Sequence, residues 1–398
     1  MTASRTSQNR QLGVGFLGAG PLNRTHHMPN IAQIPQARIE AVCDLDADRL
    51  ASAAQRYRPR LATRDLDQML ADQAVELVII ATAPPLQADL TRRALAAGKH
   101  VFVEKPMAET AQQCLQIGAL ARQVGRYVAT GYNRRFSPAY RDLKQVIDGR
   151  NVPPMMSYRL LDDDRGRRNW TDRPHLIDEV CHIFDILAWL ANDQPVQIFC
   201  LDLPGQNYQI LIRFAHGATA HILTGGRGNF AWPKERIEVV LDHVVLAVDD
   251  FVELRAANVP GLERKCYPGR EYEGYPGGYA QRLAQEGLGL ELQLRRQIAE
   301  LWQTDGLADM PPGPQREALR QRVFAGKALP PVNYMVDKGW FAAMQALVAS
   351  LLADQAPPNA GPADAARSIA CAEAAMQSVR SAEPVALDPA GWADRPDG

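Results

Sequence analysis

Hydrophobic and polar positions follow two rhythms in the first third of the chain. Short apolar runs alternate with stretches whose apolar residues recur every three or four positions. This succession is typical of βαβ units, which assemble into a parallel sheet. We expect strands at 14–17, 39–43, 77–82, 101–103 and 127–130, and helices at 46–56, 86–97 and 110–124. The pattern predicts an α/β fold with a doubly wound Rossmann sheet.

The second half follows a different rhythm, because most of its apolar runs succeed one another without long amphipathic stretches. We expect strands at 155–161, 196–203, 208–214, 219–223, 237–241 and 244–248, with a helix at 177–190. Such an order predicts an α+β domain with a large, open, mostly antiparallel sheet.

These patterns suggest how the chain divides. We expect a flexible tail at 1–10, a dinucleotide-binding domain at 11–133, a substrate and oligomerisation domain at 134–387, and a second tail at 388–398. Residues 264–333 lengthen the second domain. They include a predicted helix with an apolar stripe, which should pack on that domain or on a partner subunit. The residues of the stripe are Leu283, Leu290, Leu294, Ile298 and Leu301.

Composition narrows the class of protein. With 398 residues, the chain is long enough for two or three domains. Lys plus Arg number 44 against 45 Asp plus Glu, so the net charge of -1 offers no basic surplus for nucleic acid. The start carries no apolar signal segment, and the apolar stretch 341–353 is too short to span a membrane. Six scattered cysteines indicate free thiols, and we expect a cytoplasmic protein with no nucleic-acid or membrane partner.

Two registers of glycines compete at the first strand. Gly13, Gly15 and Gly18 fit G-x-G-x-x-G literally, but the residues between them belong to the strand. Phosphate binding requires glycines after the strand, where backbone amides meet a helix N-terminus. We therefore take Gly18 and Gly20, followed by Pro21 and Leu22, as the working turn. Asn23 then stands where a third glycine is expected, which weakens the motif.

An acidic residue supports the cofactor reading. Asp44 ends the second strand at a spacing suited to a carboxylate that binds the adenine ribose. A carboxylate there accepts the ribose hydroxyls and repels a 2′-phosphate, so NAD is favoured over NADP. Arg49 lies close by and could soften this preference. Asp44 could instead cap the following helix, and one residue can serve both purposes.

Two segments carry a family resemblance. The chain reads Gly98-Lys99-His100-Val101-Phe102-Val103-Glu104-Lys105-Pro106, and later Gly131-Tyr132-Asn133-Arg134-Arg135-Phe136-Ser137-Pro138. These segments resemble the Gfo/Idh/MocA family, which includes glucose–fructose oxidoreductase and inositol dehydrogenase. The likeness continues in later segments around 233–239, 249–251, 337–339 and 378–387 and covers most of the chain.

The resemblance implies roles for particular residues. Glu104-Lys105-Pro106 would lie beside the nicotinamide, with a cis peptide before Pro106, and Lys105 would contact cofactor ribose and substrate hydroxyl. The implied cofactor set is Gly18, Gly20, Pro21, Leu22, Asp44, Arg49, Thr82, Gln87, Glu104, Lys105 and Asn133. The implied substrate set is Lys105, Asn133, Arg159, Trp170, Asp178 and His182.

Asp178 and His182 lie four apart in a predicted helix, hence on one helical face. They are similar to the family element in which His is the general base and the Asp positions substrate and base. A histidine suits that role because its ordinary pKa of ~6.5 lets it take and return a proton near neutrality. A buried structural histidine is the plainer alternative. A metal site is not expected, because Cys181 points about 100° away from His182 on a helix.

Several positions depart from the family pattern. Gln87 stands where many members carry His, and Pro174 begins the segment that replaces a glycine pair before Asp178. Both changes predict an altered pocket. Trp170 is the candidate for stacking on a sugar ring, whereas the charged block 162–168 reads as a solvated turn.

These observations favour an NAD-dependent dehydrogenase that oxidises a secondary hydroxyl of a sugar, inositol or related polyol, with catalytic residues Lys105, Asp178 and His182. Two other functions stay open: a redox-neutral glycoside-processing enzyme that oxidises its substrate transiently, and a catalytically silent sugar or NAD sensor. We expect a homodimer or homotetramer formed through the second sheet, since an antiparallel sheet covered on one face leaves the other available.

Overall fold

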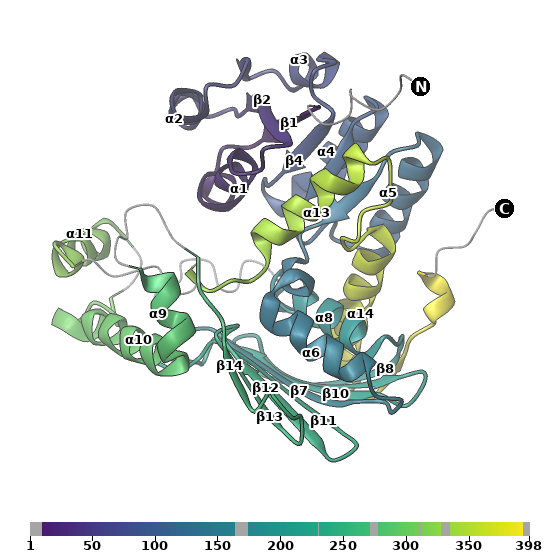
Figure 1. The fold of residues 1–398 in the computed structure, drawn as a ribbon, viewed down its shortest axis with the longest axis vertical. Coiled ribbons are helices and arrows are strands. Elements are labelled where there is room, and N and C mark those ends of the chain that lie inside the picture. The colour runs from purple at the N-terminus through teal and green to yellow at the C-terminus, as the bar shows by residue number, and fades with distance from the viewer. Residues whose placement is uncertain are drawn as a thin grey trace. The chain divides into compact units, whose positions relative to one another are not determined.

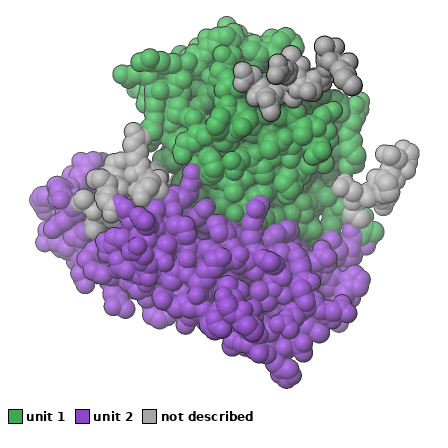
Figure 2. All heavy atoms as spheres, viewed as in Figure 1, with its two compact units in different colours: residues 1–136, 339–370, 390–398 green, residues 137–338, 371–389 purple. Residues whose placement is uncertain are grey.

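The computed structural model describes residues 10–163, 174–229, 231–270, 278–310, 313–327 and 335–392. The chain forms two compact units, coloured separately in Figure 2. Unit 1 comprises residues 1–136, 339–370 and 390–398, and unit 2 comprises residues 137–338 and 371–389. The division falls within one long helix, α14 (Pro362–Ser381).

Unit 1 contains a six-stranded parallel sheet in the order β3-β2-β1-β4-β5-β6. Its strands are β1 (Leu12–Leu17), β2 (Ala37–Cys43), β3 (Leu61–Thr63), β4 (Leu77–Ile80), β5 (His100–Val103) and β6 (Val128–Thr130). Every residue of β1 and β4 is buried, as expected for strands covered on both faces. The predicted doubly wound sheet is confirmed; the short strand β3 was not predicted.

Helices cover both faces of this sheet (Figure 1). They are η1 (Asn23–His27), which is a π-helical turn, and α1 (Met28–Ala32), α2 (Ala47–Tyr57), α3 (Leu66–Ala71), α4 (Pro84–Ala96), α5 (Ala111–Gln123), the 3-10 turn η2 (Asn133–Phe136) and α13 (Trp340–Leu352). Residues of α1 and α13 share one apolar cluster with alternate residues of β1, β4 and β5.

The placement of α13 differs from the boundaries expected from sequence. Residues 339–370 were expected in the second domain, yet they belong to unit 1. The reason is packing: Met344, Leu347, Val348 and Leu351 of α13 are buried in the cluster that also contains Val14 and Phe16 of β1. The apolar stretch 341–353 therefore completes the core of the first sheet.

Unit 2 contains a nine-stranded sheet in the order β14-β13-β12-β11-β7-β10-β9-β8-β15. The strands are β7 (Met155–Leu161), β8 (Pro195–Leu203), β9 (Asn207–Phe214), β10 (Thr219–Gly225), β11 (Glu235–Leu241), β12 (Val244–Asp249), β13 (Glu253–Ala257), β14 (Arg264–Cys266) and β15 (Val385–Ala386). Only β7 and β10 pair in parallel, so the mostly antiparallel sheet is confirmed. The strand β13 and its neighbour β14, at one edge of the sheet, were not predicted.

One face of this sheet is covered. The helices α6 (Pro138–Asp148), α7 (His175–Asp178) and α8 (Cys181–Ala191) and the second half of α14 contribute residues to a single apolar core with the strands (Figure 1). In β7, Met156, Tyr158 and Leu160 point into this core. Their neighbours Ser157 and Arg159 therefore lie on the other, outer face.

The segment expected to lengthen the second domain does lie in unit 2, but its predicted helix is broken. It forms α9 (Tyr279–Glu286), α10 (Leu288–Gln303), the short η3 (Thr304–Gly306) and α11 (Pro314–Phe324). Gly287 separates α9 from α10 with φ 63° and ψ −142°, a conformation that side chains rarely adopt. Leu283 and Leu290 are buried in the core of unit 2, so the apolar stripe packs there as expected.

All six cysteines lie in the described residues and none is in a disulfide. Across the described ranges, no helix combines the length and apolar character that crossing a membrane requires.

Candidate active site

The glycine turn begins where β1 ends. Gly13 and Gly15 lie inside β1, and a Cβ on Gly13 would be 1.8 Å from the carbonyl oxygen of Ala74. Gly18 follows the strand with φ +89°, in the left-handed region that favours glycine. A Cβ placed on Gly20 would meet no heavy atom within 4 Å, so the space over this backbone is open. Of the two registers, only the one that starts at Gly18 has its glycines after the strand.

Asp44 is tied to this turn. Its Oδ2 accepts a hydrogen bond from the Ala19 N–H at 2.6 Å, and its Oδ1 accepts one from the Asp46 N–H at 2.8 Å. A carboxylate offers about four lone-pair sites, so both oxygens keep capacity for further donors. Asp46, not Asp44, caps α2 by accepting from Asp48 N–H and Arg49 N–H. The capping role considered for Asp44 therefore belongs to Asp46.

Asn23 stands at the position of the third glycine and is buried. Its side-chain Nδ2 donates to the carbonyl oxygens of Leu17 and Gly18, at the end of β1. A third glycine would allow a close helix–strand approach. Here a buried amide holds the start of the helix to the strand by hydrogen bonds instead. Pro21 and Leu22 start that helix, and η1 follows them.

The Glu104-Lys105-Pro106 turn follows β5, and its Lys105–Pro106 peptide is cis, as the resemblance implies. The Glu104 side chain is buried and accepts from the Lys105 N–H at 3.0 Å. Its other oxygen, Oε1, lies 2.8 Å from Nε2 of His27 in η1. A Cβ on Gly131 would fall 2.5 Å from Glu104 Oε2. Neither His27 nor Gly131 was predicted; only the paired histidines 26 and 27 after the glycine turn hint at a role.

Polar atoms without partners gather after the ends of β1 and β4. Thr82 follows β4, and Gln87 lies in the first turns of α4. Among the described residues, no hydrogen-bond partner is found for the buried Thr82 Oγ1, Gln87 Oε1 or Asn23 Oδ1. Buried polar atoms normally have partners. In open α/β sheets, ligands bind beyond the carboxyl ends of the strands. These atoms, the open backbone at Gly20 and the Asp44 carboxylate fit a dinucleotide.

The predicted residues Asn133 and Arg49 differ in setting. Asn133 is buried in η2, the turn after β6. The neighbouring Arg135 pairs with Asp364 at 2.8 Å, and Arg367 pairs with the same carboxylate at 2.7 Å. Arg49 is exposed on α2, and its Nε lies 3.3 Å from Asp46. Asn133 is therefore buried, whereas Arg49 lies at the surface.

In unit 2, the predicted continuous helix at 177–190 is wrong. Asp178 ends α7, and His182 belongs to α8, which starts at Cys181. The His182 N–H bonds the Glu179 carbonyl oxygen at 3.3 Å, so the regular hydrogen-bond pattern of an α-helix is interrupted between Asp178 and His182. The two residues stay one turn apart along the chain, but they do not share a regular helical face. His182 is buried.

A charged cluster lies beside α7. Lys234 Nζ pairs with the buried Asp162 at 3.0 Å and lies 4.0 Å from Glu179. His175 bonds Thr224 Oγ1 at 2.8 Å, and burial is the main cause of its lowered pKa. The block 162–168 was expected to be a solvated turn. Its first two residues, Asp162 and Asp163, are instead buried. Residues 164–173, and with them Trp170, lie outside the described residues.

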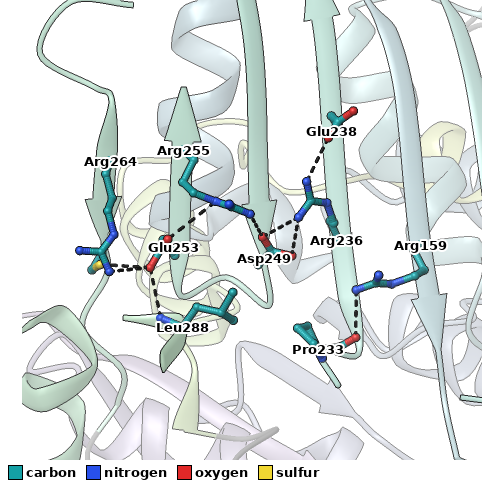
Figure 3. A network of polar contacts seen from close by, with 10 residues as sticks. Arg159, Pro233, Arg236, Glu238, Asp249, Glu253, Arg255, Arg264 and Leu288 are labelled. Carbon is teal, nitrogen blue, oxygen red and sulfur yellow. Dashed lines mark hydrogen bonds and ion pairs between the residues drawn. The ribbon is translucent and has the colours of Figure 1, made fainter. Parts of the chain in front are cut away.

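Arg159 is not brought together with His182. It lies on the outer face of the sheet, whereas α8 packs on the inner face. Figure 3 shows it in a row of outer-face charges, where its Nη2 donates to the Pro233 carbonyl oxygen at 3.2 Å. Its guanidinium also lies 5.9 Å from the Trp232 ring. The structure therefore places Arg159 on the face of the sheet opposite α8, and its substrate-binding role stays a prediction.

Comparison with known proteins agrees with this geometry. Residues 12–132 match the family model described as "Oxidoreductase family, NAD-binding Rossmann fold". The inositol 2-dehydrogenase of Acidothermus cellulolyticus is 31% identical over 188 residues, which cover 47% of this chain and 55% of that protein. The chain thus aligns with little more than half the length of this relative.

Solved structures match over nearly the whole chain. A myo-inositol dehydrogenase from Sinorhizobium meliloti, described as putative, gives a TM-score of 0.69 at 19% identity and covers 95% of this chain and 100% of that one. GenD2 from gentamicin A biosynthesis, solved in complex with NAD, gives a TM-score of 0.65 at 20% identity, covering 97% and 99%. At these identities the likeness bears on the fold. The match of residues 12–132 shows that unit 1 contains an NAD-binding Rossmann domain of the Gfo/Idh/MocA oxidoreductase family, and the solved structures share the fold of nearly the whole chain.

Proposed function

We propose that this protein is an NAD-dependent dehydrogenase that oxidises a secondary hydroxyl of a sugar, inositol or related polyol. The observation that carries the proposal is the Glu104-Lys105-Pro106 turn at the carboxyl end of β5, where a buried carboxylate accepts from the Lys105 N–H. This edge of a parallel sheet is where such folds bind nucleotides. Similarity to inositol 2-dehydrogenases supports the substrate class.

Three residues carry the chemistry in this proposal. His182 takes the proton of the substrate hydroxyl, and Lys105 places a cation near the oxygen as it becomes an alkoxide, which lowers the cost of that charge. Asp178 orients the substrate. NAD supplies the acceptor for the hydride that leaves the same carbon, so the alcohol becomes a carbonyl and one proton stays on His182.

The remaining residues bind the two ligands. For NAD, the proposal assigns the turn residues to the pyrophosphate and Asp44 to the adenine ribose, and the full set is Gly18, Gly20, Pro21, Leu22, Asp44, Arg49, Thr82, Gln87, Glu104, Lys105 and Asn133. Asn133 and Trp170 join the three catalytic residues at the substrate. The unpartnered Thr82 and Gln87 atoms support the first set.

The experiment is a nicotinamide absorbance assay across a panel of sugars, inositols and polyols. We expect turnover with NAD, and a large loss of kcat for Lys105→Met and for His182→Ala. His216→Ala is the matched control, because His216 is an exposed histidine of the same unit and pairs with Asp193. A protein that binds NAD tightly but turns over no member of the panel refutes the proposal. Sugar release without accumulation of NADH would replace it with redox-neutral glycoside processing.

We also propose that two copies associate through the outer face of the nine-stranded sheet. Large apolar side chains are exposed there, namely Met155, Leu201, Leu211, Leu223, Val240 and Val245. Several of them line a hollow of about 680 Å³ on this face. A row of both charge signs adjoins it, including Arg236 and Asp249, paired at 3.0 Å (Figure 3). Mixed charges beside an apolar patch suit a self-complementary interface.

Light scattering after size-exclusion chromatography tests this association. Leu211→Asp should yield monomers, because it places a charge inside the apolar patch. Leu45→Asp is the control, since Leu45 is an exposed leucine of unit 1. A Leu211→Asp protein with the mass of the wild-type oligomer would refute the interface.

A further inference from the structure

A buried histidine connects the glycine turn to the Glu104-Lys105-Pro106 turn. The His27 side chain has no exposed surface, and its Nε2 lies 2.8 Å from Oε1 of Glu104. His27 belongs to η1, which follows Gly18 and Gly20, whereas Glu104 follows β5. Residues 77 positions apart in the sequence are thus joined at the edge of the sheet where the nucleotide is expected.

The histidine ring has a defined orientation. No hydrogen-bond partner for its Nδ1 is found among the described residues. The other ring nitrogen, Nε2, makes the contact to Glu104. An ionised carboxylate only accepts, so we assign the ring proton to Nε2 in this contact. Phe102 packs edge-on against the ring, with 5.2 Å between centroids, and fixes the plane.

Two polar contacts and one close backbone neighbour hold the carboxylate of Glu104. Oε1 faces His27, and Oε2 accepts the Lys105 N–H at 3.0 Å. The Cα of Gly131 leaves room for the carboxylate, since a Cβ there would lie 2.5–2.8 Å from its three terminal atoms. A shift of the Glu104 carboxylate therefore disturbs the hydrogen bond that holds the Lys105 N–H.

We propose that His27 is a positioning residue: by fixing the Glu104 carboxylate, it sets the backbone of Lys105 and couples that residue to the helix after the cofactor turn. The inference rests on the proposed function, in which Lys105 acts on the substrate. It adds a residue that does not touch the reacting atoms and acts only through Glu104. Loss of the histidine should therefore weaken cofactor binding as well as turnover.

The first test needs no substrate. NADH affinity is measured by fluorescence titration for wild type, His27→Leu, His27→Gln and Gly131→Ala. Leucine removes the donor, and glutamine restores an N–H at the position of Nε2. We expect about 10-fold weaker binding for His27→Leu, the loss for one hydrogen bond to a charged group, and near-wild-type binding for His27→Gln. Gly131→Ala should weaken binding too, because it displaces the carboxylate without removing any polar group.

A magnetic resonance signal checks the contact itself. In protein with nitrogen-labelled histidine, the Nε2 proton of His27 should exchange slowly with water, because it is buried and hydrogen-bonded. The exchange should be faster in Gly131→Ala and unchanged in His100→Gln. His100 is the matched control, a histidine of the same sheet whose Nδ1 accepts the Tyr127 N–H at 3.1 Å. An Nε2 proton unaffected by Gly131→Ala would overturn the proposal.

Turnover on a substrate of the wild type gives the second readout. We expect His27→Leu to lower kcat more than it raises the substrate KM, and His27→Gln to restore kcat. Equal losses in the two variants, in proportion to their melting temperatures, would show a merely structural role and overturn the inference. If the wild type turns over no polyol, the proposed function fails, while NADH affinity and the Nε2 proton still decide the role of His27.

Discussion

Replacing Asp44 by asparagine tests how this protein recognises its cofactor. The substitution keeps the size of the side chain but removes its charge and one acceptor oxygen. In the structure each carboxylate oxygen already accepts a hydrogen bond from a backbone N–H, that of Ala19 at 2.6 Å and that of Asp46 at 2.8 Å. An asparagine amide can satisfy only one of them, because its NH2 group would face the other donor.

The magnitude follows from these bonds. A hydrogen bond to a charged acceptor contributes about 1.5–3 kcal/mol, so losing one at the ribose weakens NADH binding by about 10- to 100-fold. Losing one backbone bond at a half-buried position lowers the free energy of unfolding by about 1 kcal/mol. The preference for NAD over NADP should also shrink, because the charge that repels the 2′-phosphate is gone.

Fluorescence titration with NADH and NADPH, together with urea denaturation, measures both effects. Asp46→Asn is the matched control, because Asp46 caps α2 and asparagine is an equally good cap. We expect this control to bind NADH as the wild type does. The reasoning fails if Asp44→Asn binds NADH within about threefold of wild type, or if Asp46→Asn is equally impaired.

Three further predictions concern stability. Lys338→Met removes the cation 2.9 Å from the buried Glu235 carboxylate, and should lower the free energy of unfolding in urea by about 3–5 kcal/mol; a loss below about 1 kcal/mol would contradict it. Burial acts to raise the pKa of Asp364, but Arg135 and Arg367 outweigh it and lower that pKa to about 2. The stability from this group is thus present above about pH 4 and is lost as the pH falls toward 2. When the free energy of unfolding is measured by urea denaturation at a series of pH values, Asp364→Asn should therefore reduce its change between about pH 4 and pH 2. Burial, with Arg126 beside it, lowers the pKa of His100 to about 4. The native state is therefore favoured above about pH 6.5 and loses stability as the pH falls toward 4. His100→Gln should remove this dependence of the free energy of unfolding on pH. An unchanged dependence in that variant would refute the prediction.

Strand positions could be predicted because apolar alternation directly reflects burial. The same rule places Arg159 on the outer face, since Tyr158 and Leu160 on either side of it face the core. The glycine register was also predictable, because Val14 and Phe16 had to be strand residues and the turn therefore had to follow them.

Other features depend on contacts that no local pattern encodes. Their spacing alone predicts that Asp178 and His182 share one helical face. The regular helical hydrogen-bond pattern is interrupted between them, because the His182 N–H bonds the carbonyl oxygen of Glu179. The apolar stripe of 283–301 gives no sign of the break at Gly287, where a left-handed φ separates α9 from α10. His27 and Glu104 lie 77 positions apart in the sequence, and only the fold brings the two together.

The discontinuity of unit 1 has a consequence for how the protein is made. The first sheet emerges from the ribosome early, but the apolar cluster on one of its faces includes Met344, Leu347, Val348 and Leu351 of α13. Until that helix has been synthesised, this cluster remains incomplete and its apolar residues lack part of their cover. Domains generally fold in the order of synthesis. Here the unit that begins first cannot finish until nearly all of unit 2 has been translated, so the nascent chain must keep an unfinished core from aggregating throughout that interval.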